Sequence, residues 1–375
     1  MNQYIEFYAK HNISPVRQDI SDFDSHLKRR AALYANLGLP AFAFRGSRVL
    51  EVGPGGGYNS LATYCFGPDE YHLVEPNPAG FSELKDNFSK NGFDRNFYPH
   101  NCMLEDFDSD TKFDIVLCEG LVQGLPDKKT FLSKLAMFAA PGGMLVITAA
   151  DQISMFFEIA RRHMANVITS EENDFGKKLD IMVRAFASHL STIKGMTRRH
   201  DDWCADLICD AIYNHSFSIE DAVSIVGGEF YLNETCPRYF TDSRWYKGLP
   251  RDTAEFNAER LKSFAAKWHG LMDYRHVFLP RSAEKNKELS ILCRDLITEV
   301  QSQEKNRTDD KMILELVHSI IDNVKDMNPQ TVRSIEEFAD IVKKGRYVPE
   351  EISGMSVFAS AFGRGQTFIS FNKVF

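Results

Sequence analysis

No stretch of this 375-residue chain stays apolar for the ~18 residues that a membrane span requires, and the longest candidate is interrupted at Pro141. The first ten residues lack the apolar core of a secretory signal peptide. The seven cysteines are scattered and show neither metal-ligand nor disulfide spacing. These absences predict a cytoplasmic chain without a membrane span and without a metal.

Positive charge is also scarce, since 44 Lys and Arg residues face 52 Asp and Glu residues and leave a formal net charge of -8. A protein that holds phosphate backbones over a broad surface needs the opposite balance. Nucleic acid is therefore disfavoured as a partner. The length allows a substantial core with room for an added domain or large insertions, and we expect that surplus to serve a binding partner or oligomerisation, for example as a homodimer.

Glycine, by contrast, is concentrated in one segment. Residues 49–60 form an apolar run that ends near Glu51, pass through Gly53, Gly55 and Gly57, and then turn polar. This order predicts a strand, a tight turn and the start of a helix. Glycine permits positive φ angles and removes the Cβ atoms that would hold a ligand away from the backbone. We therefore expect a ligand to lie against this turn.

Residues 71–77 predict a second short strand, which Pro76 stops. Glu75 then stands at the carboxyl end of that strand, about 20 residues beyond the glycine turn, where α/β sheets place an acid that accepts hydrogen bonds from ribose hydroxyls. Taken alone, Glu75 is equally compatible with a solvated strand end. Together with the glycine turn it predicts a ligand that contains a nucleoside.

The spacing of the glycines separates two classes of cofactor. A dinucleotide turn has the pattern G-x-G-x-x-G, but the position of its third glycine is occupied here by Tyr58. The pattern is G-x-G-x-G instead, and with Glu51 before it the segment resembles motif I of the class I, Rossmann-like S-adenosylmethionine-dependent methyltransferases. The segments 112–120 and 141–148 resemble later strands of the same core, so the resemblance covers roughly residues 46–150.

The resemblance implies an α/β fold, with a seven-stranded Rossmann-like sheet and helices on both faces, and S-adenosyl-L-methionine as cofactor. The glycine turn would hold the methionine end, Glu75 the ribose, and Glu119 would face the acceptor. Where the family usually has Asp against the adenine amine, this chain has Asn101, which is a departure. The expected cofactor contacts are Glu51, Gly53, Gly55, Gly57, Tyr58, Glu75, Pro76, Asn101, Cys102, Cys118 and Glu119.

Several of these residues have structural interpretations as well. Asn101 suits a turn, in which Asn bonds its own backbone, and Cys118 suits a small buried position. Glu119 is either a site group or a carboxylate that caps a helix. In the lead-in helix expected over residues 25–38, Arg29, Arg30 or Tyr34 would reach the cofactor's carboxylate, but a solvated basic face is the favoured interpretation of either arginine.

The candidate catalytic residues are His200 and Glu119. His200 lies in the segment 198–203, which concentrates a possible base, two acids and an aromatic side chain. The alternative is a helix start at which Asp201 or Asp202 caps the backbone. A metal site of the catechol-methyltransferase kind is not predicted, because no further acidic cluster accompanies the two aspartates.

The apolar patterns predict a discontinuous core interrupted by helical segments, and Ser218 begins the part where the core resumes. We expect the stretch 301–311 to be a polar linker. The predicted organisation is a helical cap (1–45), the first part of the cofactor-binding core (46–150), a helical lid (151–217), a core helix and strand (218–250), a second helical insertion (251–350) and a C-terminal hairpin that completes the sheet (351–375).

The sequence thus predicts a methyltransferase that acts on a hydroxyl or amino group of a small molecule, such as a sugar or another metabolite. The lead-in from His26 to Pro40 is similar to that of bacterial methyltransferases of surface-glycan and secondary-metabolite pathways. Two other classes remain: a nicotinamide-dependent oxidoreductase, against which Tyr58 weighs, and a non-catalytic relic that serves as a scaffold, against which the intact Glu51 and Glu75 weigh.

Overall fold

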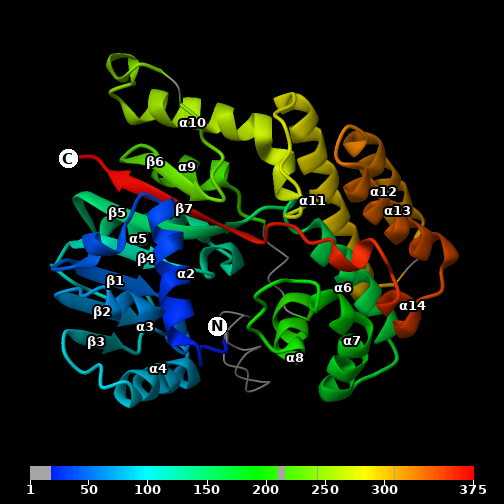
Figure 1. Ribbon diagram of the computed structural model, residues 1–375, viewed down its shortest axis with the longest axis horizontal. Coiled ribbons are helices and arrows are strands. Elements are labelled where there is room, and N and C mark those ends of the chain that lie inside the picture. Colours follow the sequence, from blue (N-terminus) through cyan, green and yellow to red (C-terminus); the bar gives the residue numbers. More distant parts are fainter. Residues whose placement is uncertain (1–17, 210–215, 243, 308) are drawn as a thin grey trace. The chain divides into compact units, whose positions relative to one another are not determined.

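The computed structural model describes residues 18–209, 216–242, 244–307 and 309–375, which divide into two compact units (Figure 1). The sheet unit comprises the described residues of Met1–Ala149, Phe217–Phe264 and Gln366–Phe375. The helical unit comprises those of Ala150–Ser216 and Ala265–Gly365. Each unit is therefore assembled from segments that are distant in sequence.

The sheet unit contains one seven-stranded sheet in the order β3-β2-β1-β4-β5-β7-β6. Its parallel part runs from β3 to β5, while β6 and β7 pair antiparallel. The order of strands reverses between β1 and β4, and ligands of open α/β sheets bind at the carboxyl edge of such a switch point. The strands are β1 (Arg48–Val52), β2 (Glu70–Val74), β3 (Phe97–His100), β4 (Phe113–Cys118), β5 (Ala139–Ala150), β6 (Phe230–Cys236) and β7 (Gln366–Lys373).

Helices cover both sides of this sheet, which confirms the predicted Rossmann-like α/β class. One face is buried by a core in which Tyr34, Leu61 and Leu84, one from each of three helices, pack with Val49 and Ile115 of the strands. The helices and short turns of the sheet unit are α2 (Phe23–Asn36), η1 (Ala41–Phe44), α3 (Tyr58–Cys65), α4 (Pro78–Lys90), η2 (Val122–Gly124), α5 (Lys128–Met137), α9 (Ile219–Val226), η5 (Tyr246–Gly248) and most of α10 (Thr253–Lys267).

These helices begin where the sequence supplies caps. The Asp22 carboxylate accepts the Ser25 N–H before α2, and Asn77 caps α4 ahead of a proline in its first turn. Ser218 and Asp221 form a capping box at α9, the helix expected to begin there. These caps thus fix the residues at which α2, α4 and α9 begin.

Apart from Ala150, the last residue of β5, the helical unit contains no strand residue in the part of it that the structure describes. Its α6 and α11 are joined by the ion pair between Arg162 and Glu304. Its elements are α6 (Phe156–Ile168), α7 (Phe175–Leu190), α8 (His200–Trp203), η3 (Cys204–Ile208), η6 (Trp268–Leu271), α11 (Ala283–Lys305), α12 (Lys311–Val324), α13 (Pro329–Lys344), α14 (Pro349–Ser353) and η7 (Phe358–Ser360). Within the described part of the chain, no helix is long and apolar enough to cross a membrane.

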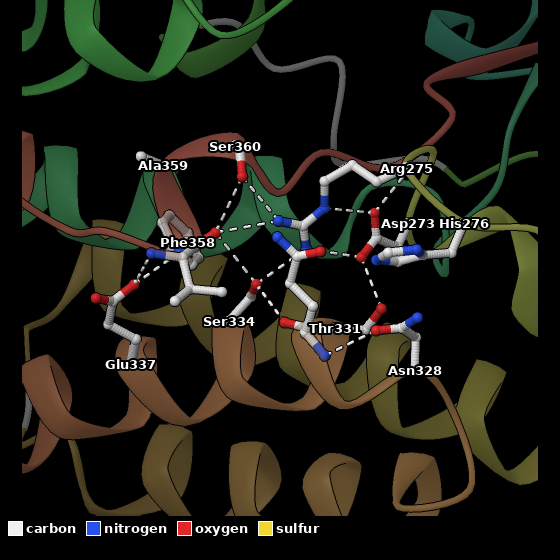
Figure 2. Close-up of polar contacts among 12 residues, drawn as sticks. Asp273, Arg275, His276, Asn328, Thr331, Ser334, Glu337, Phe358, Ala359 and Ser360 are labelled. Carbon is white, nitrogen blue, oxygen red and sulfur yellow. Dashed lines mark hydrogen bonds and ion pairs between the residues drawn. The ribbon is translucent and has the colours of Figure 1, made fainter.

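A polar clasp, centred on Asp273 and Arg275, holds three segments of the helical unit together (Figure 2). The Arg275 guanidinium donates to both Asp273 carboxylate oxygens, at 2.9 and 2.7 Å, and to the Ser334 hydroxyl of α13 at 3.0 Å. Thr331 donates to Asp273 at 2.7 Å. The Glu337 carboxylate accepts the N–H groups of residues 356–358. The clasp therefore pairs its buried charges fully.

Three expectations about segment boundaries need correction. The predicted C-terminal hairpin is a single strand, β7, because its antiparallel partner is the distant β6. The predicted insertion 251–350 begins too early, since α10 up to Phe264 belongs to the sheet unit. The predicted linker 301–311 is helical up to Lys305, where Gln303 bonds Glu299 one turn earlier at 3.0 Å. The expected cap over residues 1–17 lies outside the described residues.

Candidate cofactor site at the carboxyl edge of the sheet

The turn between β1 and α3 depends on glycine. Gly53, Gly55 and Gly57 have φ angles of 76°, 57° and 77°, a left-handed conformation in which L side chains are strained. A Cβ on Gly57 would also lie 2.3 Å from Cδ1 of Leu84 in α4. A substituted chain would therefore be strained at these φ angles, and at position 57 the Leu84 side chain would also have to move.

Glu75 reaches across from β2 to this turn. Its Oε2 accepts the Gly55 N–H at 2.8 Å and its Oε1 accepts the Asn77 N–H at 2.8 Å. Burial raises the pKa of Glu75, while the bonds from Asn77 and Gly55 oppose that rise. Each carboxylate oxygen has a further lone pair, so a pair of ribose hydroxyls can donate to it. The arrangement fits a nucleoside cofactor.

Side chains from the neighbouring helices hold the rest of the turn. Asn87 of α4 donates to the Gly56 carbonyl oxygen at 2.8 Å, and a His26 ring nitrogen lies 3.1 Å from the Tyr58 carbonyl oxygen. The Tyr58 hydroxyl donates to Glu83 at 2.7 Å. The turn is therefore preorganised from both sides, with the Tyr58 side chain directed to α4.

The residues expected against the adenine lie beside β2 and β3. Asn101 donates from Nδ2 to the Glu75 carbonyl oxygen at 2.7 Å, which links the ends of the two strands. Pro76 and Cys102 are half-buried, and burial raises the pKa of the Cys102 thiol. Their contacts with an adenine stay predictions.

A buried carboxylate cluster lies on the face of the sheet that α2 covers. Alternation along the strands places Glu51 with Val49, and Glu119 with Ile115, on this face. Arg30 and Tyr34, one helical turn apart on α2, reach the same face. We define the cluster as Arg30, Tyr34, Glu51, Tyr71 and Glu119.

Within the cluster, Glu119 is the better paired carboxylate. Arg30 donates to its two oxygens at 2.6 and 2.8 Å, and the Tyr34 hydroxyl donates to it at 2.8 Å. Glu51 accepts a hydrogen bond from the Tyr71 hydroxyl. Arg30 is only 7% exposed, so the solvated basic face considered for it is wrong.

The nearby Glu119 carboxylate affects the ionisation of Glu51. Burial and the nearby Glu119 raise the pKa of Glu51 to about 7, although Tyr71 and Arg30 oppose the shift. Burial also raises the pKa of the Cys118 thiol well above its usual range, so Cys118 is a buried neutral side chain at this edge. The cluster therefore combines two acids with one guanidinium in a largely buried space.

Sequence reasoning missed Gln123, which lies in η2 just beyond β4. The Gly120 N–H donates to the Thr148 hydroxyl at 2.7 Å, and that hydroxyl donates to Gln123 Oε1 at 3.2 Å. This chain of donors fixes the orientation of the amide. Gln123 is 1% exposed, and its Nε2 has no hydrogen-bond partner among the described residues. A buried amide with an unused donor can donate a hydrogen bond to an oxygen atom of a ligand bound near the carboxyl ends of β4 and β5.

His200, the other candidate catalytic residue, is the first residue of α8 in the helical unit. The neighbouring Asp201 pairs with Arg199 at 2.6 Å, and Trp203 is buried against Phe362 in the core of that unit. Neither neighbour therefore forms the open acid and aromatic wall expected around His200. A role for His200 stays a prediction. In the described part of the chain, no group of three or more His, Cys, Asp or Glu side chains is placed to hold a metal ion.

Residues 23–181 match a family model described as a methyltransferase domain. No curated protein matches the chain significantly.

Among solved structures, an S-adenosylmethionine-dependent methyltransferase from Mesorhizobium loti is 18% identical to this chain. The match covers 33% of this chain and 53% of the methyltransferase, with a TM-score of 0.29. The N-methyltransferase NodS from Bradyrhizobium japonicum is 19% identical over 40% and 74% of the two chains, with a TM-score of 0.32. The match thus spans about half of the first structure's length, and TM-scores this low describe a partial likeness.

The order of the strands, the glycine turn and Glu75 define a nucleoside-binding α/β domain of the Rossmann-like type. The match over residues 23–181 is to a methyltransferase domain and supports a class I, S-adenosylmethionine-dependent methyltransferase family for this part of the chain. The cofactor of that family is S-adenosyl-L-methionine, and the residues at the carboxyl edge fit it.

Proposed function

We propose that the chain is a methyltransferase that moves the methyl group of S-adenosylmethionine to a hydroxyl or amino group of a small molecule, such as a sugar or another metabolite. The observation that carries the proposal is Glu75, whose buried carboxylate faces the glycine turn through the Gly55 N–H at 2.8 Å. Nucleic acid remains disfavoured as acceptor by the net charge of -8.

Held by Glu75 and the glycine turn, S-adenosylmethionine would supply a methyl group on a positively charged sulfur, and that sulfur would keep the electron pair of the broken bond when the acceptor's lone pair bonded to the methyl carbon. The protein's main contribution is to align the acceptor with that methyl group. A base is needed only where the acceptor must lose a proton.

The roles of the residues follow from their contacts. Glu75 and the glycine turn bind the ribose and the methionine end. We assign Glu119 a positioning role, because Arg30 and Tyr34 already donate three hydrogen bonds to its carboxylate. Gln123 offers its unused Nε2 to an oxygen of the acceptor. His200 is retained as the candidate base.

Methyl transfer to a panel of sugars, amines and hydroxylated metabolites tests this function, with production of S-adenosylhomocysteine as the readout. We expect turnover with at least one class of acceptor, and we expect Gly55→Val to abolish cofactor binding because valine is strained at a φ of 57°. Binding of NAD in place of S-adenosylmethionine would instead support the oxidoreductase. Cofactor binding without turnover on any acceptor would support the scaffold.

A further inference from the structure

The carboxylate cluster holds more negative than positive charge. Glu51 is 5% exposed, and Glu119 forms an ion pair with Arg30. The guanidinium of Arg30 is the positive group that acts on both acids. The other groups around Glu51 are neutral: Tyr34 on α2, Ser60 on α3, Tyr71 on β2 and Cys118 on β4. With both acids ionised, the cluster carries one uncompensated negative charge.

Glu51 is the residue that carries this excess. Arg30 and Tyr34 together give Glu119 three hydrogen bonds, whereas Glu51 accepts one from the Tyr71 hydroxyl. No lysine or arginine nitrogen in the described part of the chain lies within ion-pair distance of Glu51. Glu51 also stands two residues before Gly53, where the cofactor turn begins. Its charge is therefore buried next to the start of the turn to which we assign the cofactor, and it is poorly screened.

The two forms of the cofactor differ in charge. S-adenosylmethionine carries a sulfonium, an ammonium and a carboxylate, for a net charge of +1 at neutral pH. S-adenosylhomocysteine has lost the sulfonium charge and is neutral overall. A buried negative charge next to the site therefore interacts differently with the substrate form and with the product form.

We propose that the carboxylate cluster makes the cofactor site selective for charge, so that it binds cationic S-adenosylmethionine in preference to neutral S-adenosylhomocysteine, and that protonation of Glu51 removes this preference. The inference rests on the proposed function, because it concerns the same cofactor. Its consequence is weak inhibition by the product while Glu51 is ionised, and stronger inhibition in acid.

Two features make Glu51 the switch. Its hydrogen-bond partner Tyr71 can face either protonation state of the carboxyl group, since a phenol both donates and accepts. Burial and Glu119 also hold the pKa of Glu51 at about 7, so the group changes charge near neutral pH. Glu119, by contrast, has Arg30 as its ion-pair partner.

Calorimetric titration with S-adenosylmethionine, S-adenosylhomocysteine and adenosine tests the inference without an acceptor. The range from about pH 5.5 to about pH 7.5 lies below the usual titration of α-amino groups. We expect the ratio of the dissociation constants, homocysteine form over methionine form, to be about tenfold at the upper pH and about twofold at the lower, as an uncompensated charge requires.

In Glu51→Gln the ratio should stay near its low value across the whole range, while adenosine, which has no charge, should bind as it does to the parent. The matched control is Asp114→Asn, which removes a carboxylate at the amino edge of the same sheet, where Asp114 accepts the Arg48 N–H at 2.8 Å. That variant should keep the pH-dependent ratio of the parent.

A ratio that does not change with pH in the parent, or that changes equally in Glu51→Gln, would overturn the inference and leave the proposed function standing. Failure of the parent to bind either form at any pH would overturn both. The two failures are therefore distinguishable in the same set of titrations.

Discussion

The clasp of the helical unit and the carboxylate cluster of the sheet unit both bury charged side chains, but they balance those charges differently. In the helical unit, Asp273 is fully buried and receives a bidentate bond from Arg275. In the sheet unit, Glu51 is buried without a cation of its own, and Gln123 keeps an unused donor. Satisfied polar networks stabilise and specify a fold, while unsatisfied ones are costly. The contrast indicates that the helical unit's clasp is structural and that the edge of the sheet is prepared for a ligand.

The largest effect should come from breaking the clasp. Arg275→Ala leaves the Asp273 carboxylate buried without its partner, and we expect a loss of about 3–5 kcal/mol in the free energy of unfolding. Urea denaturation measures it. The matched control, Arg294→Ala, removes an exposed arginine 3.7 Å from Asp295 and should cost less than about 0.5 kcal/mol. Equal effects for the two variants would mean that the clasp is not the structural element we infer.

The pH dependence of stability sharpens the comparison at Glu51. The pKa of Glu51 is raised from 4.5 to about 7 in the folded chain, so folding favours the protonated form. The free energy of unfolding should therefore fall as pH rises from about 4.5 to about 7, by up to about 3 kcal/mol, and this contribution should then level off.

Glu51→Gln should lack that slope, which denaturation at a series of pH values would show. The corresponding variant in the helical unit is Glu158→Gln, since burial raises the pKa of Glu158 to about 7 as well. Glu158→Gln should remove a separate slope of the same sign. A parent and a Glu51→Gln variant with parallel pH profiles would show that Glu51 is ionised normally.

An intermediate effect is expected for cofactor affinity. Glu75→Ala removes the acceptor for the ribose hydroxyls and for the Gly55 N–H, so binding of S-adenosylmethionine should weaken by about 1.5–3 kcal/mol. Calorimetry measures the change. Glu70→Ala, at the other end of β2, is the control and should bind like the parent. Loss of binding in both variants would point to general damage to the strand.

The smallest effect on stability is expected at Gln123. Gln123→Met replaces an amide whose Nε2 has no partner among the described residues, so the free energy of unfolding should change by about 1 kcal/mol or less. Methyl transfer to the acceptor should fall by a larger factor than cofactor affinity. A large loss of stability with normal transfer would show that Gln123 serves the fold alone.

Local patterns allowed three elements of the sheet unit to be predicted. The glycine turn, the end of β2 and the N-cap at Ser218 each depend on residues close together in sequence. The pairing of Arg30 with Glu119 joins residues 89 positions apart, and no local pattern distinguishes Arg30 from its exposed neighbours. Long-range contacts of this kind also explain why the partner of β7 was missed.

The acceptor side was less predictable for a physical reason. Gln123 stands in a short turn without a motif, and its significance appears only when Thr148 of β5 fixes the amide from the next strand. At His200 the cluster of charged residues was visible, but the pairing of Asp201 with Arg199 was not. Hydrogen-bond capacity that remains unused is a property of the folded chain.

The central claim is that the carboxyl edge of the sheet binds S-adenosylmethionine. Calorimetric titration of the full-length chain with S-adenosylmethionine, S-adenosylhomocysteine and NAD tests it most directly. We predict micromolar binding of the first two, no binding of NAD, and weaker binding of S-adenosylmethionine to Glu75→Ala. Binding of NAD alone, or affinity for S-adenosylmethionine that is unchanged in Glu75→Ala, would contradict the assignment of this edge of the sheet as a methyltransferase cofactor site.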